Sequence, residues 1–276
     1  MQIDRLSTAL GARITGIDLA RDLNDSRAGE IRAALNEYGV LQIPDQQIDD
    51  DQHKAIARYF GDIFIHPNFN TGDHDPELVW VVRNPGDTRI VGEEWHADTT
   101  MMSSPPMGAL LYGQEVPPAG GDTLFAAQWL AYDALSDGMK RTLDSLACVH
   151  SDRKVAGPAA ALNGKRATVV REDADWQPTS NIHPVVHTHP ESGRRCLFVN
   201  HSYSVRFDGW SESESRPLLE WLMDWGHRPE FTCRLSWAPG TMVFWDNRST
   251  KHFAVNDVRE GRRVMRRVQI SGEPIR

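Results

Sequence analysis

The stretch Thr241–His252 reads TMVFWDNRSTKH, and its first five residues form a short hydrophobic run of the kind that predicts a β-strand. Similar runs recur along the chain and dominate its second half. They lie at residues 39–44, 78–82, 109–112, 122–125, 185–189, 196–199, 232–237 and 263–270. Many short strands with few helices favour a barrel or a two-sheet jelly roll with helices on its outside. We therefore predict a fold that is mainly β with peripheral helices.

Three segments predict those helices. Two lie near the N-terminus, at residues 25–37 and 49–60, and the third begins at Ser211 and carries its apolar stripe as far as Trp225. Residues 151–180 are polar and aperiodic, which is typical of a long excursion from a sheet. We expect residues 1–276 to form a single domain with a lid insertion at about residues 151–180.

The composition limits the kinds of partner that the protein can bind and the cellular compartment in which we expect it. Of 276 residues, 40% are hydrophobic and 25% are charged, which excludes wholesale disorder. A net charge of −8 argues against a nucleic-acid partner. No apolar run approaches the ~18 residues of a membrane helix, and the first residues lack the layout of a signal peptide, so we expect no membrane association. Because Cys148, Cys196 and Cys233 are odd in number and widely spaced, we expect no disulfide framework and a cytoplasmic location.

The tripeptide His96-Ala97-Asp98 is the first candidate for metal binding. Residues i and i+2 of an extended segment point to the same side, so His96 and Asp98 can grip one cation. His252, which lies 154 residues after Asp98, offers a third ligand if the fold brings it close. Two histidines and one carboxylate form the facial triad of non-heme Fe(II) oxygenases. A tetrahedral zinc site with the same ligands, or an exposed polar turn, remains open on ligand chemistry alone.

Two arginines near the C-terminus are candidates for binding organic acids. If residues 263–270 form a strand, Arg263 and Arg267 lie on one face of it. The planar guanidinium binds both oxygens of a carboxylate, so this face suits anionic ligands. The alternative is a solvated edge strand whose charges prevent aggregation.

Taken together, these motifs resemble the taurine dioxygenase/TfdA family. The resemblance rests on Trp95 to Asp98, on Gly120-Gly121-Asp122-Thr123, on Trp245 through His252, and on an arginine pair that follows His252 by 11 and 15 residues. It covers the chain from about Ala12 to Gly272. Members of this family are Fe(II)- and 2-oxoglutarate-dependent oxygenases. The resemblance implies a double-stranded β-helix, which is a cupin-like jelly roll.

The resemblance also implies a role for each matching residue. His96, Asp98 and His252 would ligate Fe(II). Arg263 would pair with the distal carboxylate of 2-oxoglutarate, Thr123 would donate a hydrogen bond to it, and Trp245 would pack beside the iron. The primary substrate would meet its own set of side chains. Arg267 would bind the anionic head of the substrate, and His66 would also contact the substrate. At two further substrate positions this chain differs from taurine dioxygenase: Phe69 replaces a tyrosine, and Gly92 replaces an amide residue.

The reaction that the resemblance implies consumes 2-oxoglutarate and O₂ and hydroxylates a substrate C–H, with release of succinate and CO₂. Because Gly92 and Phe69 lack the polar groups of taurine dioxygenase, a more apolar acid than taurine is favoured. We expect a small anionic substrate of the aryloxyalkanoate, alkylsulfate or sulfonate type, and the aryloxyalkanoate branch is favoured. The family implies a homo-oligomer, a dimer or tetramer. A zinc-dependent hydrolase and a non-catalytic acid-binding jelly roll remain alternatives, but neither explains both the ligand triad and Arg263.

Overall fold

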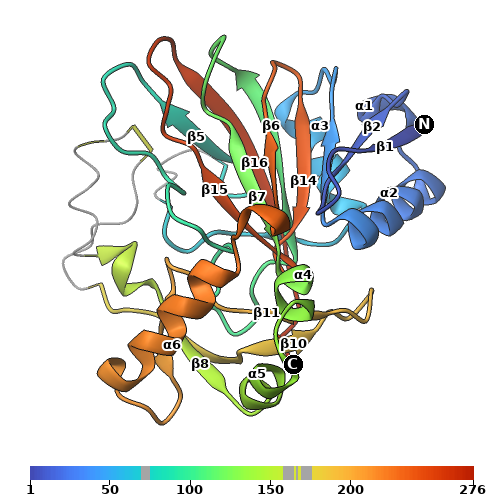
Figure 1. The fold of residues 1–276 in the computed structure, drawn as a ribbon. Coiled ribbons are helices and arrows are strands. Elements are labelled where there is room, and N and C mark those ends of the chain that lie inside the picture. Colours follow the sequence, from blue (N-terminus) through green and yellow to red (C-terminus); the bar gives the residue numbers. More distant parts are fainter. Residues whose placement is uncertain (70–74, 158–164, 166, 169–175) are drawn as a thin grey trace.

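The structure is a computed structural model that describes residues 1–69, 75–157, 165, 167–168 and 176–276 (Figure 1). Its strands are β1 Gln2–Arg5, β2 Ala12–Thr15, β3 Val40–Ile43, β4 Ile63–Phe64, β5 Val79–Arg83, β6 Gly108–Glu115, β7 Thr123–Ala127, β8 Ala147–Ser151, β9 Ser180–Pro184, β10 Val186–Thr188, β11 Arg195–Leu197, β12 Ser204–Phe207, β13 Thr232–Leu235, β14 Met242–Asp246, β15 Thr250–Ala254 and β16 Arg263–Ile270. Its helices are α1 Leu19–Asp22, α2 Asp25–Tyr38, α3 Asp50–Arg58, α4 Gln128–Asp133, α5 Asp137–Leu143 and α6 Glu212–Trp225, with short 3₁₀ turns η1 Asp152–Lys154 and η3 Pro229–Phe231.

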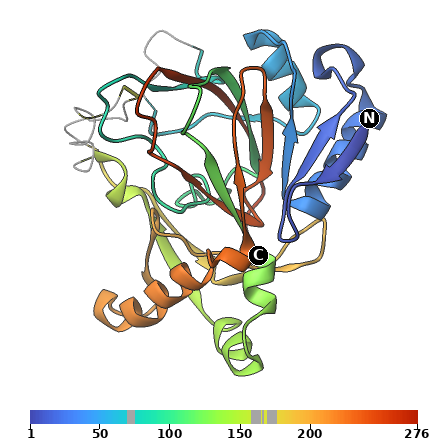
Figure 2. The same cartoon turned by 45° about the horizontal axis from the view of Figure 1, so that its top comes forward.

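Two sheets form the centre of the molecule. The large sheet has eight strands in the order β1-β2-β3-β14-β6-β16-β4, with β5 also paired to β16. The small sheet has the order β13-β7-β15. A third sheet, β12-β8-β9, and the β10–β11 hairpin lie towards the end of the molecule that holds α5 and α6 (Figures 1 and 2). The prediction of a mainly β jelly roll with peripheral helices is confirmed.

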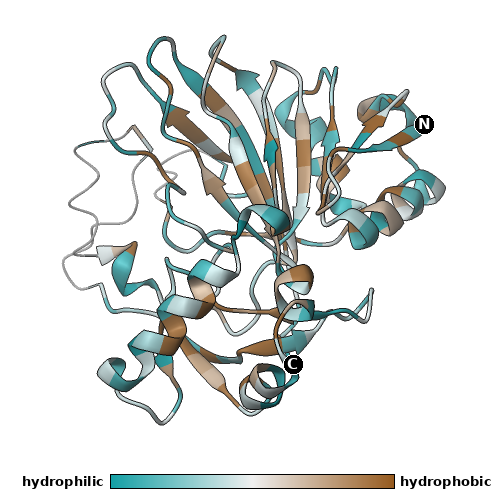
Figure 3. Ribbon diagram, viewed as in Figure 1, coloured by the Kyte–Doolittle hydropathy of each residue, from teal (hydrophilic) through white to brown (hydrophobic). Residues whose placement is uncertain are grey.

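Strand β14 shows how the sequence builds two hydrophobic layers. Successive residues of a strand point to opposite faces. Met242 and Phe244 therefore join a core beneath α2 and α3, whereas Val243 and Trp245 join a second core between the large and small sheets. Because both faces of β14 are buried, its sequence is a continuous apolar run. In Figure 3 the hydrophobic residues concentrate in these strands, and the loops are mostly hydrophilic.

The predicted helices are present and are bounded by the expected side chains. Asp49 and Ser211 cap α3 and α6, each with a reciprocal capping box to the residue three positions on. Helix α2 begins at Asp25, as predicted, and is capped by Asn24, whose side chain accepts the hydrogen bond from Arg27 N–H. Helix α6 buries Leu219 and Leu222 in a third core over β8 and β12.

Several expectations need correction. Strand β16 lies between β6 and β5 and is buried at all eight positions, so the edge-strand alternative for the arginines is wrong. His252 lies within β15, a strand that the hydrophobic runs did not predict, because its polar residues pair with β7. Half of the predicted lid at residues 151–180 lies outside the described residues, namely residues 158–164, 166 and 169–175. No helix in the described part of the chain is long and apolar enough to cross a membrane.

A buried ion-pair network fixes the loop between β14 and β15. Asp246, which is fully buried, accepts hydrogen bonds from Arg248 and from His189 Nε2 at 3.0 Å. Arg248 and Arg32 both pair with Glu191, at 2.9 and 2.8 Å. Burial alone raises the pKa of Asp246, but Arg248 and His189 outweigh it and hold that pKa well below its ordinary value. The network therefore joins this loop to the β10–β11 hairpin and α2.

We predict that Asp246→Ala lowers the free energy of unfolding by about 3–5 kcal/mol, because it leaves a buried cation without its partner. Urea denaturation measures the loss. The control is Asp144→Ala, whose carboxylate pairs with Arg195 at 2.5 Å with both side chains about 40% exposed. An exposed pair contributes less than about 1 kcal/mol. Equal small losses in both variants would contradict the role given to the network.

Candidate active site

Two histidines from distant parts of the chain meet through backbone pairing. His96 N–H donates to His252 O at 3.0 Å, and His252 N–H donates to His96 O at 2.7 Å, in an antiparallel bridge. Asp98 follows two residues later. Its Oδ1 lies 3.7 Å from His96 Nε2 and 3.8 Å from His252 Nε2. All three side chains are buried, so the structure brings the predicted trio together.

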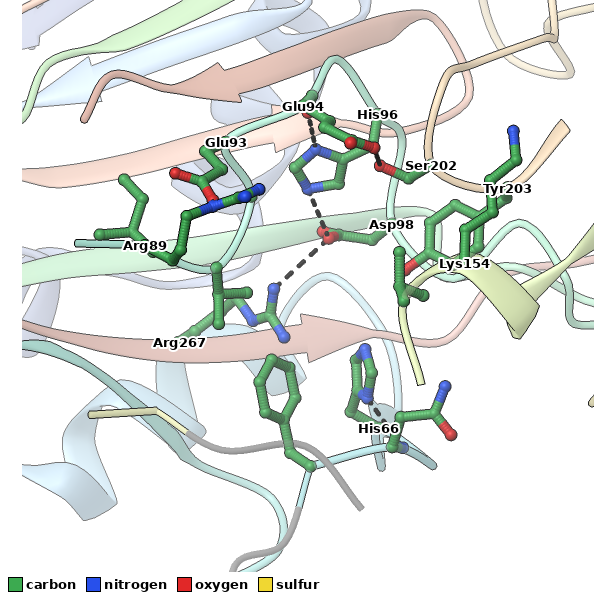
Figure 4. Close-up of a pocket in the computed structure, with 16 residues that line it drawn as sticks. His66, Arg89, Glu93, Glu94, His96, Asp98, Lys154, Ser202, Tyr203 and Arg267 are labelled. Carbon is green, nitrogen blue, oxygen red and sulfur yellow. Dashed lines mark hydrogen bonds and ion pairs between the residues drawn. The ribbon is translucent and has the colours of Figure 1, made fainter. Parts of the chain in front are cut away.

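The hydrogen bonds and charges around the trio suit a divalent cation. His96 Nδ1 lies 2.6 Å from the Glu94 carbonyl oxygen and donates a hydrogen bond to it, so Nε2 is the ring nitrogen that faces Asp98 and is placed to bind a metal (Figure 4). Burial and the neighbouring His96 lower the pKa of His252 well below its ordinary value. For Asp98, burial raises the pKa, but Arg267 and the histidines outweigh it and bring that pKa to about 2. Two imidazole nitrogens and one carboxylate oxygen are a donor set that fits Fe(II).

Asn247 orients the carboxylate of this trio, and the motifs did not single it out. Its Nδ2 donates to Asp98 Oδ2 at 3.4 Å, and its Oδ1 accepts from Asp98 N–H at 3.3 Å. Trp245 Nε1 donates to the same Oδ1 at 2.9 Å. The indole ring of Trp245 also packs 4.8 Å from the His252 ring. The signal that could have found Asn247 is its place in the motif from Trp245 to His252, in the turn directly after β14.

A small pocket beside the trio holds the predicted co-substrate residues. Thr123, Trp245, His252 and Arg263 all line it. Burial lowers the pKa of Arg263 to about 10, so the side chain remains a cation at neutral pH. Its Nε has no hydrogen-bond partner among the described residues, although it is buried. Such a cation favours an anionic ligand in this pocket.

Trp237 links two of these residues and was not predicted. Its Nε1 donates to Thr123 Oγ1 at 3.0 Å, so the Thr123 hydroxyl hydrogen is free to donate elsewhere. The Arg263 guanidinium lies 5.6 Å from the centre of the Trp237 ring. Behind the arginine, Gly121 has a φ of +73°, and a Cβ there would approach Arg263 Cδ to 3.0 Å. The Gly120-Gly121 turn therefore leaves room for the arginine.

A larger pocket opens on the other side of Asp98, and the four predicted substrate residues line it (Figure 4). Arg267 Nη1 lies 3.4 Å from Asp98 Oδ1, and its guanidinium lies 5.0 Å from the centre of the Phe69 ring. Arg267 Nε and Nη2 are buried and have no partner among the described residues. His66 Nδ1 accepts from Asn68 N–H at 3.1 Å, so Nε2 carries the proton of this ring. Burial and Arg267 lower the pKa of His66 to about 3, which leaves it neutral.

Gly92 shapes the border between the two pockets. Its φ is +83°, which favours glycine, and a Cβ there would lie 3.1 Å from His96 Cε1. It therefore offers the substrate no side-chain hydrogen bond.

The remaining wall of the larger pocket comes from loops that carry no motif. Ile90, Val91 and Val155 supply apolar surface, and Tyr203 is buried among them. Lys154 Nζ donates to the carbonyls of His201 and Ser204 at 3.1 and 3.0 Å. Arg89 and Glu93 pair with each other. Sequence reasoning missed these residues because their place at the pocket depends on how separate loops meet.

Comparison with known proteins agrees with this geometry. The family model "Taurine catabolism dioxygenase TauD, TfdA family" matches residues 2–269. The chain is 33% identical to an alkylsulfatase of Acinetobacter baylyi, over 99% of this chain and 86% of that protein. It is 32% identical to an (S)-phenoxypropionate/alpha-ketoglutarate-dioxygenase of Sphingobium herbicidovorans, over 98% and 94%.

Solved structures show the same likeness. A taurine dioxygenase from Burkholderia xenovorans superimposes with a TM-score of 0.82 at 33% identity, over 99% of this chain and 90% of that one. The structure of AAD-2 with Mn(II) and N-oxalylglycine superimposes with a TM-score of 0.80 at 30% identity, over 99% and 98%. The chain therefore belongs to the TauD/TfdA family and is a 2-oxoglutarate-dependent non-heme iron dioxygenase.

Proposed function

We propose that His96, Asp98 and His252 ligate the Fe(II) of this dioxygenase. The single observation that carries this assignment is the convergence of their donor atoms within 4.8 Å of one another in a buried site. A zinc hydrolase with the same trio is not favoured, because the family is one of iron oxygenases. Bound Fe(II) supplies the activation of O₂ that hydroxylation of a C–H bond requires. Asn247 holds the carboxylate oxygen that is turned away from the histidines.

The pocket of Thr123, Trp245 and Arg263 holds 2-oxoglutarate in this proposal. Arg263 pairs with the distal carboxylate, and the free hydroxyl hydrogen of Thr123 donates to the same group. The opposite, keto acid end of the molecule then faces His252 and the metal. A buried cation without a partner supports the assignment, because an anion in the pocket removes the cost of leaving it unpaired.

The larger pocket holds the primary substrate, with its anionic head at Arg267 and His66. Arg267 offers two nitrogen atoms that have no partner in the part of the chain that the structure describes, and neutral His66 donates through Nε2. Ile90, Val91 and Phe69 then contact an apolar body. Because Gly92 and Phe69 stand where taurine dioxygenase has polar side chains, an acid more apolar than taurine is favoured. The pocket thus supports a small organic acid with an apolar alkyl or aryl group.

The relatives act on aryloxyalkanoates, sulfate esters and sulfonates, and of these we propose an aryloxyalkanoate or an alkyl sulfate ester for this chain. One relative is a phenoxypropionate dioxygenase, and another is an alpha-ketoglutarate-dependent sulfate ester dioxygenase of Pseudomonas putida, 30% identical over 99% of this chain and 90% of that protein. Hydroxylation of the carbon beside the ether or ester oxygen gives a product that collapses. The C–O bond breaks, and a carbonyl compound and a phenol or sulfate leave. The residues that bind the anionic head group of the substrate orient this carbon towards the metal.

A panel of aryloxyalkanoates, alkyl sulfates, sulfonates and N-acyl amino acids tests the proposal. Succinate formed in the presence of Fe(II), O₂ and 2-oxoglutarate is the readout. We expect stimulation by aryloxyalkanoates or alkyl sulfates above the level without a primary substrate. Stimulation by N-acyl amino acids alone would contradict the substrate class.

We predict that Arg263→Ala raises the KM for 2-oxoglutarate at least about 30-fold, because loss of one partner of a buried charge pair costs about 2–5 kcal/mol. Initial rates of succinate formation against 2-oxoglutarate concentration measure the change. The KM for the primary substrate is the internal control and should change little. An unchanged requirement for 2-oxoglutarate would remove Arg263 from the co-substrate site.

We predict the opposite pattern for Arg267→Ala, which weakens use of the primary substrate while leaving the KM for 2-oxoglutarate nearly unchanged. The matched variant Arg267→Lys keeps the charge and loses the planar fork, so it should restore only part of the affinity. Steady-state kinetics with both substrates varied measures the two constants. If Arg267→Ala leaves substrate affinity intact, the head group binds elsewhere.

We also propose that the protein is a cytoplasmic homo-oligomer, a dimer or tetramer. All three cysteines are free and buried, and burial raises the pKa of each thiol. Unpaired thiols support a reducing compartment. Light scattering on the purified protein measures the oligomeric state, and a monomer at micromolar concentration would contradict the second part.

A further inference from the structure

A second group of metal-ligand side chains lies outside the active site, and we call it the His201 cluster. It consists of His201, Asp224 and His227, whose donor atoms all lie within 4.8 Å of one another. Asp224 Oδ1 is 3.4 Å from His201 Nε2 and 3.9 Å from His227 Nε2. Both distances exceed the usual length of a hydrogen bond. The three donors therefore surround one point without closing onto each other.

The backbone holds both histidines of the His201 cluster in place. His201 N–H donates to the Trp95 carbonyl at 3.1 Å, and His227 N–H donates to the Asp224 carbonyl at 3.3 Å. The Trp95 and His227 rings stack with centroids 5.2 Å apart and planes 10° apart. Asp224, in the last turn of α6, is 73% exposed at its side chain and is free to adjust to an ion. Little reorganisation is needed before a cation binds.

Charged groups of both signs lie near the His201 cluster. Burial, together with the nearby Lys251 ammonium, lowers the pKa of His201 to about 4 and also lowers that of His227. Both imidazoles are therefore neutral at pH 7, as ligation requires. Lys251 repels a cation, so it limits the affinity, while the Asp224 carboxylate attracts one.

We propose that His201, Asp224 and His227 bind a second divalent metal ion of the zinc class, with water completing a four-coordinate site. Two histidines, one carboxylate and an open position are a ligand set that zinc accepts. The site is separate from the buried trio of His96, Asp98 and His252, although Trp95 connects the two. Exposure of Asp224 makes it accessible to an ion in solution.

Cobalt(II) is the probe for this site because its visible absorption depends on coordination number. Four-coordinate Co(II) absorbs strongly, whereas six-coordinate Co(II), expected at the active site with 2-oxoglutarate bound, absorbs weakly. We expect the metal-free protein with saturating 2-oxoglutarate to bind two equivalents of Co(II), one of them with the strong band. Asp224→Asn and His227→Ala should lose that band and one equivalent, while iron-dependent succinate formation stays unchanged.

Two further variants separate the sites. Glu220→Gln removes the same charge from an exposed position of α6, and it should keep both equivalents and the strong band. His96→Ala should lose the weakly absorbing equivalent alone. Binding of a single equivalent by the unaltered protein, or a strong band that persists in both Asp224→Asn and His227→Ala, would overturn the proposal.

A different observation, which rests on the proposed co-substrate site, concerns Arg83. Arg83 on β5 lies directly opposite Arg263 on β16, and both line one small cavity with Gly121 and Val258. Like charges directly opposite each other destabilise a strand pair. Within the described residues neither arginine forms an ion pair. Arg83 Nε and Nη1 and Arg263 Nε are buried without partners, and Arg83 Nη2 donates to the Val258 carbonyl at 2.5 Å.

We infer that Arg83 is a second cation for the distal carboxylate of 2-oxoglutarate. An anion between the two guanidinium groups removes their repulsion and gives partners to the free N–H groups. Arg83 therefore adds to the selection of a dicarboxylic keto acid over a monocarboxylic one.

Kinetics of Arg83→Gln and Arg83→Lys test this role. We expect Arg83→Gln to raise the KM for 2-oxoglutarate at least fivefold, Arg83→Lys to raise it less, and the KM for the primary substrate to stay unchanged in both. A KM for 2-oxoglutarate that is unchanged in Arg83→Gln would overturn the inference. Failure of Arg263→Ala to change the same constant would instead overturn the co-substrate site itself, so the two failures are distinguishable.

Discussion

The backbone pairing of His96 with His252 is the constraint on which the active site depends. Two hydrogen bonds, of 2.7 and 3.0 Å, join segments that are more than 150 residues apart in the sequence. They fix the two imidazoles side by side, with ring centroids 4.0 Å apart, before any metal is present. Asp98, which lies two residues after His96 at the start of a turn, then completes the trio. The two cores on either side of β14 keep that pairing in place, because they hold β14 and the small sheet in fixed positions.

Strand β16 gives the site its charge. Its alternation places Arg263 and Arg267 on the inner face, four residues apart, with Met265 between them in the core. Each guanidinium is buried and has nitrogen atoms without partners in the part of the chain that the structure describes. Burying two cations in this way costs free energy unless anionic ligands pair with them. In the proposed function, the same strand binds two organic acids, 2-oxoglutarate through Arg263 and the primary substrate through Arg267.

The sequence predicted most of this site and part of the fold. The metal trio, Thr123, Trp245 and both arginines could be found because their residue types and spacings match a family motif, and the structure places them together. Asn247 and Trp237 could not be found in the same way, because their roles arise from contacts with Asp98 and Thr123, which are distant in the sequence. Strand β15 was missed because its sequence, TKHFA, mixes polar and apolar residues and pairs with β7 through the backbone. The roles of His66, Phe69 and Gly92 remain predictions, although all three line the larger pocket.

The central claim is that one ferrous ion and 2-oxoglutarate bind together at His96, Asp98 and His252. Anaerobic addition of Fe(II) and 2-oxoglutarate to the metal-free protein tests it most directly, with the visible absorption of the keto acid bound to iron as the readout. We predict that the absorption appears at one iron per chain only when both are present, and that His252→Ala and Asp98→Ala abolish it. Absorption of equal strength in either variant would contradict the account.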